Sequence, residues 1–337
     1  MNLRQLSLSS TALAGLCAGC AGLNLQMVDR SVQRPSNIAV YFTVDTTSGD
    51  PVPDLTPADF HIYEDGKPVS AYESKQIIMQ PEVVAAHFTL LLVDMSGSVV
   101  GSPDMEHVVA GAASFAERVG RYQRLAVYAF DGSPRINPIV PFGAGNPQGT
   151  ARAFATFQPR DPSTNLNGAV IEAIRILEHQ LAQSPVPLRF GTLVVFTDGT
   201  DHAARVSRDT LHATLDQVGF DLFAIAVGAE VNSSEIRAIG RNGTFTSKGS
   251  ADIQRGFEEI AQRIEGFSRR YYLLSYCSPA RAGVHNVEIE AVKGTMRGRL
   301  AYDFKADGFG PNCDPNQRPA FNVRNPRMPT LPKPKTR

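Results

Sequence analysis

The middle of the chain alternates between short apolar runs and stretches with helical periodicity. Apolar runs of this kind, ended by polar and glycine residues, are typical of strands buried on both faces. They lie at residues 88–93, 123–130, 193–197 and 221–228, with a short edge strand expected at 137–142. Two of the helical stripes between and after them are Val108, Ala112, Phe115, Ala116, Val119 and Ile253, Phe257, Ile260, Ala261, Ile264. The alternation predicts an α/β domain over residues 84–268, with a doubly wound, mostly parallel sheet.

Both flanks of this domain have the alternating pattern of half-buried strands. The expected strands are 37–45 and 59–64 before it, and 271–277, 287–291 and 300–304 after it. Asp65-Gly66 is a hairpin turn. Neither flank has enough strands for a core of its own. We therefore expect residues 36–80 and 269–306 to form one small β-sandwich, into which the α/β domain is inserted. The residues expected near its shared core are Phe42, Phe60, Ile62, Ile289, Tyr302 and Phe304.

The two ends of the chain differ from the rest. Residues 1–19 have a basic start and an apolar stretch too short to span a bilayer, which is typical of a signal peptide. The stretch ends in Ala-Gly-Cys and resembles a bacterial lipoprotein signal, with Cys20 as the lipidated residue. An ordinary secretory signal is the alternative. Residues 20–35 are polar and are expected to be a tether, and the proline-rich residues 307–337 a disordered tail.

Candidate chemistry follows the first buried strand. Asp94, Ser96 and Ser98 come where that strand ends, and open α/β sheets bind their ligands at the carboxyl ends of their strands. Alternate spacing lets the three side chains turn their oxygens toward one point. Such an all-oxygen set suits a hard divalent cation, and magnesium before zinc. A polar turn with an N-capping serine is the alternative.

The D-x-S-x-S motif resembles the metal-ion-dependent adhesion site of von Willebrand factor type A domains. In that family a threonine on a second loop and an aspartate after a later strand complete the site. Thr164, in Ser-Thr-Asn-Leu-Asn-Gly, and Asp198, in Val-Phe-Thr-Asp-Gly, stand at the matching positions. The family often has glycine where this chain has Ser163. The resemblance implies that Asp94, Ser96, Ser98, Thr164 and Asp198 hold Mg²⁺, with Mn²⁺ or Ca²⁺ as alternatives.

The resemblance also implies a function without a reaction. In the family, the ion keeps a coordination position that an Asp or Glu of a protein partner fills. We therefore expect a metal-dependent protein-binding module, in adhesion or complex assembly, anchored by lipid to the outer membrane of the cell envelope. The rival is a structural component of an envelope complex, in which the metal only fixes the loops. Enzyme signals are poor: no Gly-x-Ser-x-Gly elbow, phosphate loop or His-x-x-x-His pair occurs.

Charge and cysteine content narrow the picture further. Lys and Arg number 33 and Asp and Glu number 33, so the formal net charge is zero and nucleic-acid binding has no electrostatic support. Of the four cysteines, Cys17 and Cys20 belong to the lipoprotein signal, and only Cys277 and Cys313 remain in the body of the chain. An even pair in an exported chain favours a disulfide. Two free buried thiols are the alternative.

Overall fold

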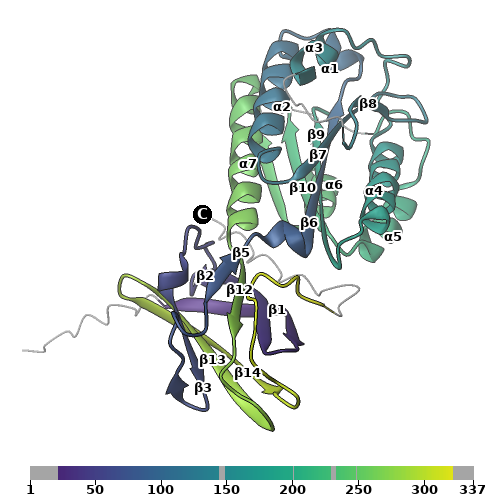
Figure 1. Cartoon of the computed structure of the whole chain (residues 1–337). Coiled ribbons are helices and arrows are strands. Elements are labelled where there is room, and N and C mark those ends of the chain that lie inside the picture. Colours follow the sequence, from purple (N-terminus) through teal and green to yellow (C-terminus); the bar gives the residue numbers. More distant parts are fainter. Residues whose placement is uncertain (1–21, 144–148, 200, 229–232, 248, 322–337) are drawn as a thin grey trace, which may run out of the picture.

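An α/β domain and a smaller β module make up the described part of the chain (Figure 1). The computed structural model describes residues 22–143, 149–199, 201–228, 233–247 and 249–321. The expected signal segment and Cys20 lie outside these residues. No helix among the described residues is long and apolar enough to cross a membrane.

The α/β domain is built on one six-stranded sheet with the strand order β11-β10-β9-β6-β7-β8. Its strands are β6 (Ala85–Asp94), β7 (Arg124–Phe130), β8 (Asn137–Val140), β9 (Leu188–Thr197), β10 (Asp221–Val227) and β11 (Gly243–Ser247). All neighbouring pairs are parallel except β7 and β8, so β8 is an antiparallel edge strand. The mostly parallel, doubly wound sheet that the sequence predicts is confirmed.

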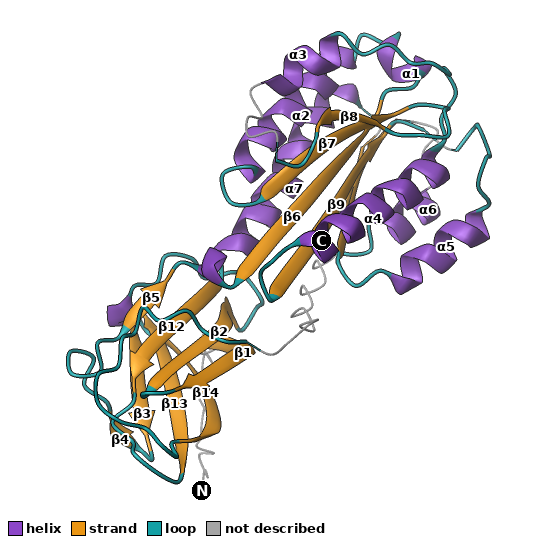
Figure 2. Ribbon diagram, turned by 45° about the vertical axis from the view of Figure 1, so that its right-hand side comes forward, coloured by secondary structure: helices purple, strands orange, loops and turns teal. Residues whose placement is uncertain are grey.

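Helices cover both faces of this sheet (Figure 2). One face carries α1 (Gly97–Val100), α2 (Met105–Val119), α3 (Thr150–Ala155) and α7 (Ile253–Arg269). The other carries α4 (Leu166–Gln183), α5 (Arg208–Gln217) and α6 (Ser233–Ile239). Short 3₁₀ turns lie at Pro57–Asp59, Pro81–Val83 and Ser250–Asp252. The long helices α2, α4 and α7 each bury one apolar stripe against the sheet, which is the packing that helical periodicity provides.

The β module consists of two antiparallel sheets that draw strands from both flanks. One has the order β1-β2-β12-β5 and the other β14-β13-β3-β4. The strands are β1 (Leu23–Gln33), β2 (Asn37–Thr46), β3 (Phe60–Glu64), β4 (Lys67–Pro68), β5 (Ile77–Met79), β12 (Tyr271–Cys277), β13 (Val284–Lys293) and β14 (Met296–Lys305). β2 pairs with β12, and β3 pairs with β13, so the two flanks share both sheets. The shared core contains all six residues expected there: Phe42, Phe60, Ile62, Ile289, Tyr302 and Phe304.

Two expectations about the ends of the chain are wrong. Residues 23–33 are strand β1 and not a tether, because Leu23 and Leu25 alternate with polar neighbours and are buried against the sandwich. Residues 307–321 also pack on the β module instead of hanging free. Phe309 and Phe321 are buried, and Ser275 donates a hydrogen bond to the Pro315 carbonyl (2.7 Å). Residues 322–337 lie outside the described part.

A disulfide joins Cys277 to Cys313, as the cysteine count predicts. The sulfurs are 2.04 Å apart and the Cα atoms 5.8 Å apart. The bond attaches the segment after β14 to the end of β12. Lys75 adds a hydrogen bond to the Cys313 carbonyl (3.2 Å). The C-terminal segment is therefore fixed to the β module by a covalent bond and by backbone contacts.

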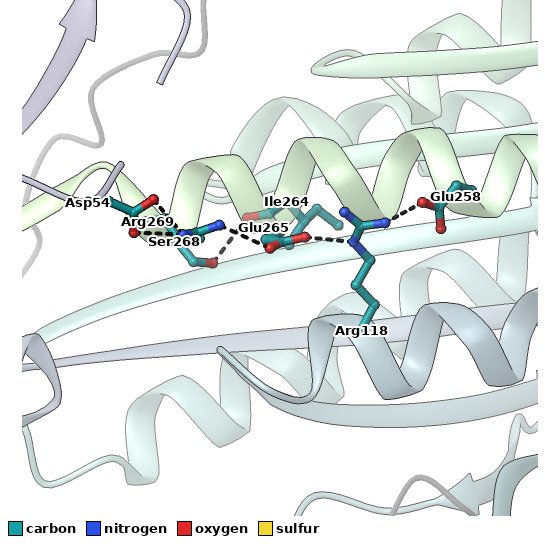
Figure 3. Close-up of polar contacts among 7 residues, drawn as sticks. All are labelled: Asp54, Arg118, Glu258, Ile264, Glu265, Ser268 and Arg269. Atoms are coloured by element: carbon teal, nitrogen blue, oxygen red, sulfur yellow. Dashed lines mark hydrogen bonds and ion pairs between the residues drawn. The ribbon is translucent and has the colours of Figure 1, made fainter. Parts of the chain in front are cut away.

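Polar contacts along α7 connect the two parts (Figure 3). Arg118 of α2 bonds Glu258 and Glu265 of α7, the second at 2.6 Å. One turn further, Arg269 makes two bonds to Asp54 of the β module (2.6 and 2.7 Å). α7 thus runs from contacts with α2 to contacts with the β module, into which the chain continues as β12.

Candidate metal centre

Asp94 is the last residue of β6 and lies at the carboxyl edge of the sheet. It is fully buried, and both carboxylate oxygens accept hydrogen bonds. The Ser96 amide donates to Oδ1 (3.0 Å), and the Thr197 hydroxyl at the end of β9 donates to Oδ2 (2.7 Å). The Met95 amide donates to the Phe130 carbonyl at the end of β7 (2.8 Å). Three strand ends therefore hold the carboxylate in place.

The two serines bring Asp94 and Asp198 into one cluster. The Ser96 and Ser98 hydroxyl oxygens are 3.1 Å apart, and the Ser98 hydroxyl also bonds the Asp198 carboxylate. Ser96 is buried, while Ser98 is exposed at the rim. Gly228, at the end of β10, has φ of 141°, and a Cβ there would lie 2.6 Å from the Asp198 carbonyl. Position 228 therefore needs glycine, because any side chain there would displace the Asp198 turn.

The threonine loop lies against both of these segments. The Gly97 amide donates to the Pro162 carbonyl (2.9 Å), and a Cβ on Gly97 would lie 2.9 Å from Cβ of Pro162. On its other side, the Ala203 amide donates to the Thr164 carbonyl (2.9 Å). The Thr164 side chain is buried. The structure therefore brings together the three segments that carry the five predicted ligands.

Electrostatics favour a cation at this cluster. Burial, and then repulsion from Asp198, raise the pKa of Asp94 to about 7. Burial also raises the pKa of Asp198, although the Ser98 hydroxyl opposes the shift. Asp198 Oδ1 is buried without a hydrogen-bond partner among the described residues. The buried carboxylate of Asp94, the partly buried carboxylate of Asp198 with its orphaned oxygen, and neutral hydroxyls form an all-oxygen donor set that fits Mg²⁺.

The cluster differs from a site built on many charged ligands. Among the described residues, no group of three or more His, Cys, Asp and Glu side chains is arranged to hold a metal ion. The present set has only two carboxylates, and its remaining oxygens are hydroxyls. Two carboxylates balance the charge of a divalent cation, so the other protein ligands of this set are neutral oxygens.

Sequence reasoning missed the residues that shape the threonine loop. Asp131 is fully buried at the end of β7, where it accepts from the amides of Ser133 and Arg160 (both 2.7 Å). Asp161 accepts from Ser163 and pairs with Arg205 (2.8 Å). In the sequence, Asp131-Gly132 and Asp161-Pro162 have the composition of turns. The available signal was that Asp131, like Asp94, directly follows a buried strand.

Comparisons with known proteins agree with this fold. The family model of the von Willebrand factor type A domain matches residues 90–262. A solved structure of von Willebrand factor type A from Catenulispora acidiphila is 11% identical, with a TM-score of 0.45, over 83% of this chain and 72% of that one. No curated protein sequence matches the chain.

Two other solved structures are similar. Proximal thread matrix protein 1 from the mussel byssus, with a zinc-occupied MIDAS motif, is 14% identical, with a TM-score of 0.42, over 60% of this chain. This chain spans about half of that protein's length (49%). The vWF domain of the type V pili tip protein Mfa5 from Porphyromonas gingivalis is 10% identical, with a TM-score of 0.41, over 56% of this chain and 97% of that one.

The matched region begins in β6, ends in α7 and includes all three segments of the candidate site. It covers more than half of the 337 residues. Domains of this type are typically modules of protein interaction and adhesion rather than enzymes. The chain belongs to the von Willebrand factor type A family.

Proposed function

We propose that this protein captures a partner protein through a divalent cation held by Asp94, Ser96, Ser98, Thr164 and Asp198. The observation that carries the proposal is the neighbouring carboxylates of Asp94, which is buried, and Asp198, which is partly buried and has one buried oxygen without a partner. Without a cation, two acids in a low-dielectric site repel each other and lose solvation. Mg²⁺ suits the all-oxygen set, and Mn²⁺ or Ca²⁺ suit it less closely.

The proposed ligand residues have different roles, which follow from their positions in the site. Asp94 is fixed by Ser96 and Thr197 and supplies negative charge from the floor of the site. Ser98 is exposed at the rim, next to where a ligand would arrive. A bound cation would offer a coordination position for a carboxylate of the partner. Asp and Glu side chains are therefore the groups that we expect a partner to present.

We further propose that the protein is a lipoprotein of the bacterial outer membrane. The support is the apolar segment that ends in Ala-Gly-Cys, with Cys20 as the lipidated residue. Stable attachment needs more than one acyl chain, which a processed lipoprotein has. Mass spectrometry of the mature N-terminus tests this, since Cys20→Ser should abolish the acyl mass.

Metal-dependent capture from an outer-membrane extract tests the binding function. The protein without its signal segment is immobilised with Mg²⁺ or with EDTA, alongside Asp94→Ala and Asp216→Ala. Asp216 is an exposed aspartate of α5, so the last variant makes the same chemical change away from the site. We expect a bound protein with the wild type and Asp216→Ala in Mg²⁺, and none with EDTA or Asp94→Ala. Equal capture by Asp94→Ala would reject the proposal and favour the structural rival.

A further inference from the structure

A second concave site lies on the α/β domain, between α4 and the β8 edge of the sheet. It is a groove of about 820 Å³, within the range of sites that bind small ligands and peptide side chains. Its walls come from β7, from the segments on either side of β8, and from α4. At one end it includes Asn165 and Arg205, beside the threonine loop, so it begins next to the candidate metal centre.

One face of α4 lines the length of the groove. Gly168, Ile171, Glu172, Arg175, Ile176 and His179 are spaced at i, i+3, i+4, i+7, i+8 and i+11, which is a single helical face. The rise per residue makes this face about 16 Å long. An extended segment of about five residues has the same length. The groove is therefore matched in length to a short stretch of peptide in extended form.

The walls combine apolar surface with positive charge. Tyr128, Phe142 and Ile176 are partly buried and leave apolar surface toward the groove. The ionisable lining residues are three arginines, one histidine and one glutamate: Arg135, Arg175, Arg205, His179 and Glu172.

Two of these basic side chains are already paired. Arg135 forms an ion pair with Glu172 (3.1 Å), which also accepts a hydrogen bond from the Ile136 amide (2.8 Å). Arg205 forms an ion pair with Asp161. Arg175 and His179 have no acidic partner among the described residues. The groove therefore offers unpaired positive charge above an apolar floor.

We propose that this groove binds an extended segment of a partner protein that carries an aromatic or aliphatic anchor flanked by Asp or Glu. The anchor fills the apolar floor, one flanking carboxylate pairs with Arg175, and another accepts a hydrogen bond from His179. The choice of a protein segment rests on the proposed function, since the groove begins beside the threonine loop. Binding in the groove itself does not require the cation.

Fluorescence anisotropy with labelled five-residue peptides tests the groove. The probe is Asp-Glu-Phe-Glu-Asp, and the control probes are Lys-Lys-Phe-Lys-Lys and Asp-Glu-Ala-Glu-Asp. All three are measured with EDTA, and the first probe is also measured with Mg²⁺. The protein variants are Arg175→Glu, Ile176→Ser, Asp94→Ala and Arg237→Glu. Arg237 is an exposed arginine of α6 outside the groove, so its replacement is the matched control for charge.

We expect Arg175→Glu to weaken binding of the acidic aromatic probe about tenfold or more, because a charge-assisted contact becomes a repulsion. Ile176→Ser should weaken it several-fold, while Arg237→Glu and Asp94→Ala leave it unchanged. Neither control probe should bind comparably. Circular dichroism spectra of all variants should match the wild type.

Two results would overturn the inference. In the first, the probe fails to bind, or binds Arg175→Glu and Ile176→Ser as tightly as the wild type. In the second, the probe needs Mg²⁺ and is lost in Asp94→Ala alone. The second result places the carboxylates at the metal centre, so it would remove the groove as a site and leave the proposed function standing.

Discussion

The buried ion pair between Arg270 and Asp45 gives the sharpest prediction about stability. Arg270 follows α7 and Asp45 lies in β2, so the pair sits where the α/β domain meets the β module. Arg270 Nη1 is 3.1 Å from both carboxylate oxygens, and the two side chains are only 2% and 6% exposed. The guanidinium also stacks over Phe267 (4.8 Å). The perturbation is Arg270→Met, which keeps the apolar stem and removes the charge.

The expected loss of stability in Arg270→Met comes from the Asp45 carboxylate, which remains buried. Burial raises the pKa of Asp45 even in the intact pair, and the attraction of Arg270 opposes that shift. Without Arg270 the carboxylate is buried and unpaired, which costs about 3–5 kcal/mol of unfolding free energy at pH 7. In the double variant Asp45→Asn with Arg270→Met, no buried charge is left. The double variant should therefore lose much less than the sum of the two single variants.

Urea unfolding followed by circular dichroism measures these free energies, and hydrogen exchange in β2 and β12 assigns the transition to the β module. The pH dependence adds a second readout. A carboxyl group whose pKa is raised on folding contributes stability below its unfolded pKa and loses it as the pH rises through the folded pKa. Arg270→Met should therefore recover stability, relative to the wild type, as the pH is lowered from 7 to 5. Additive single and double variants, or a loss below about 1 kcal/mol, would refute the reasoning.

Three further predictions concern the β module and its junction. Cys277→Ser opens a 36-residue loop and should cost about 3–4 kcal/mol in urea unfolding, whereas reductant should not change the variant further. Deleting residues 21–80 removes β2 and β3, so hydrogen exchange should show loss of protection in residues 270–305, while the α/β domain keeps its protection. Unchanged protection in residues 270–305 would contradict a shared module. Burial lowers the pKa of His87 to about 4 from its usual 6.5, where it stacks on Phe190 (4.6 Å). The free energy of unfolding should therefore fall by about 2–3 kcal/mol between pH 6.5 and 4, and His87→Phe should remove that acid sensitivity. Equal profiles of unfolding free energy against pH for the wild type and His87→Phe would count against this prediction.

Hydrophobic periodicity was enough to predict β6, β7, β8, β9 and β10 of the central sheet and the helices α2 and α7, but it did not reveal β11. The strands of the central sheet are apolar on both faces and the helices have regular stripes, so both patterns are visible without a structure. The shared β module was also predictable, because each flank alone had too few strands to cover its apolar face. The candidate site was predictable from three motifs that resemble those of the type A family. Asp94 and Asp198 follow the ends of strands, and Thr164 lies on the loop before α4.

The sequence did not reveal features that depend on distant partners. The sequence predicts a tether where β1 lies, because only Leu23 and Leu25 mark the buried face of this strand. The strand is also irregular between Met27 and Asp29. The segment that contains Phe321 is polar and proline-rich, and it is ordered by contacts with strands far away in sequence. Asp131 and Arg205 fix the threonine loop through contacts across the domain. Such long-range contacts leave no local pattern.

Calorimetric titration with Mg²⁺ tests the central claim most directly. The wild type and the surface control Asp216→Ala should each bind one Mg²⁺, and Asp94→Ala should show no heat of binding. Burial disfavours the charged form of the Asp94 carboxylate, so removing this carboxylate should not destabilise the fold. The circular dichroism spectrum of Asp94→Ala should therefore match that of the wild type. Equal affinity of Asp94→Ala and the wild type for Mg²⁺ would contradict the account.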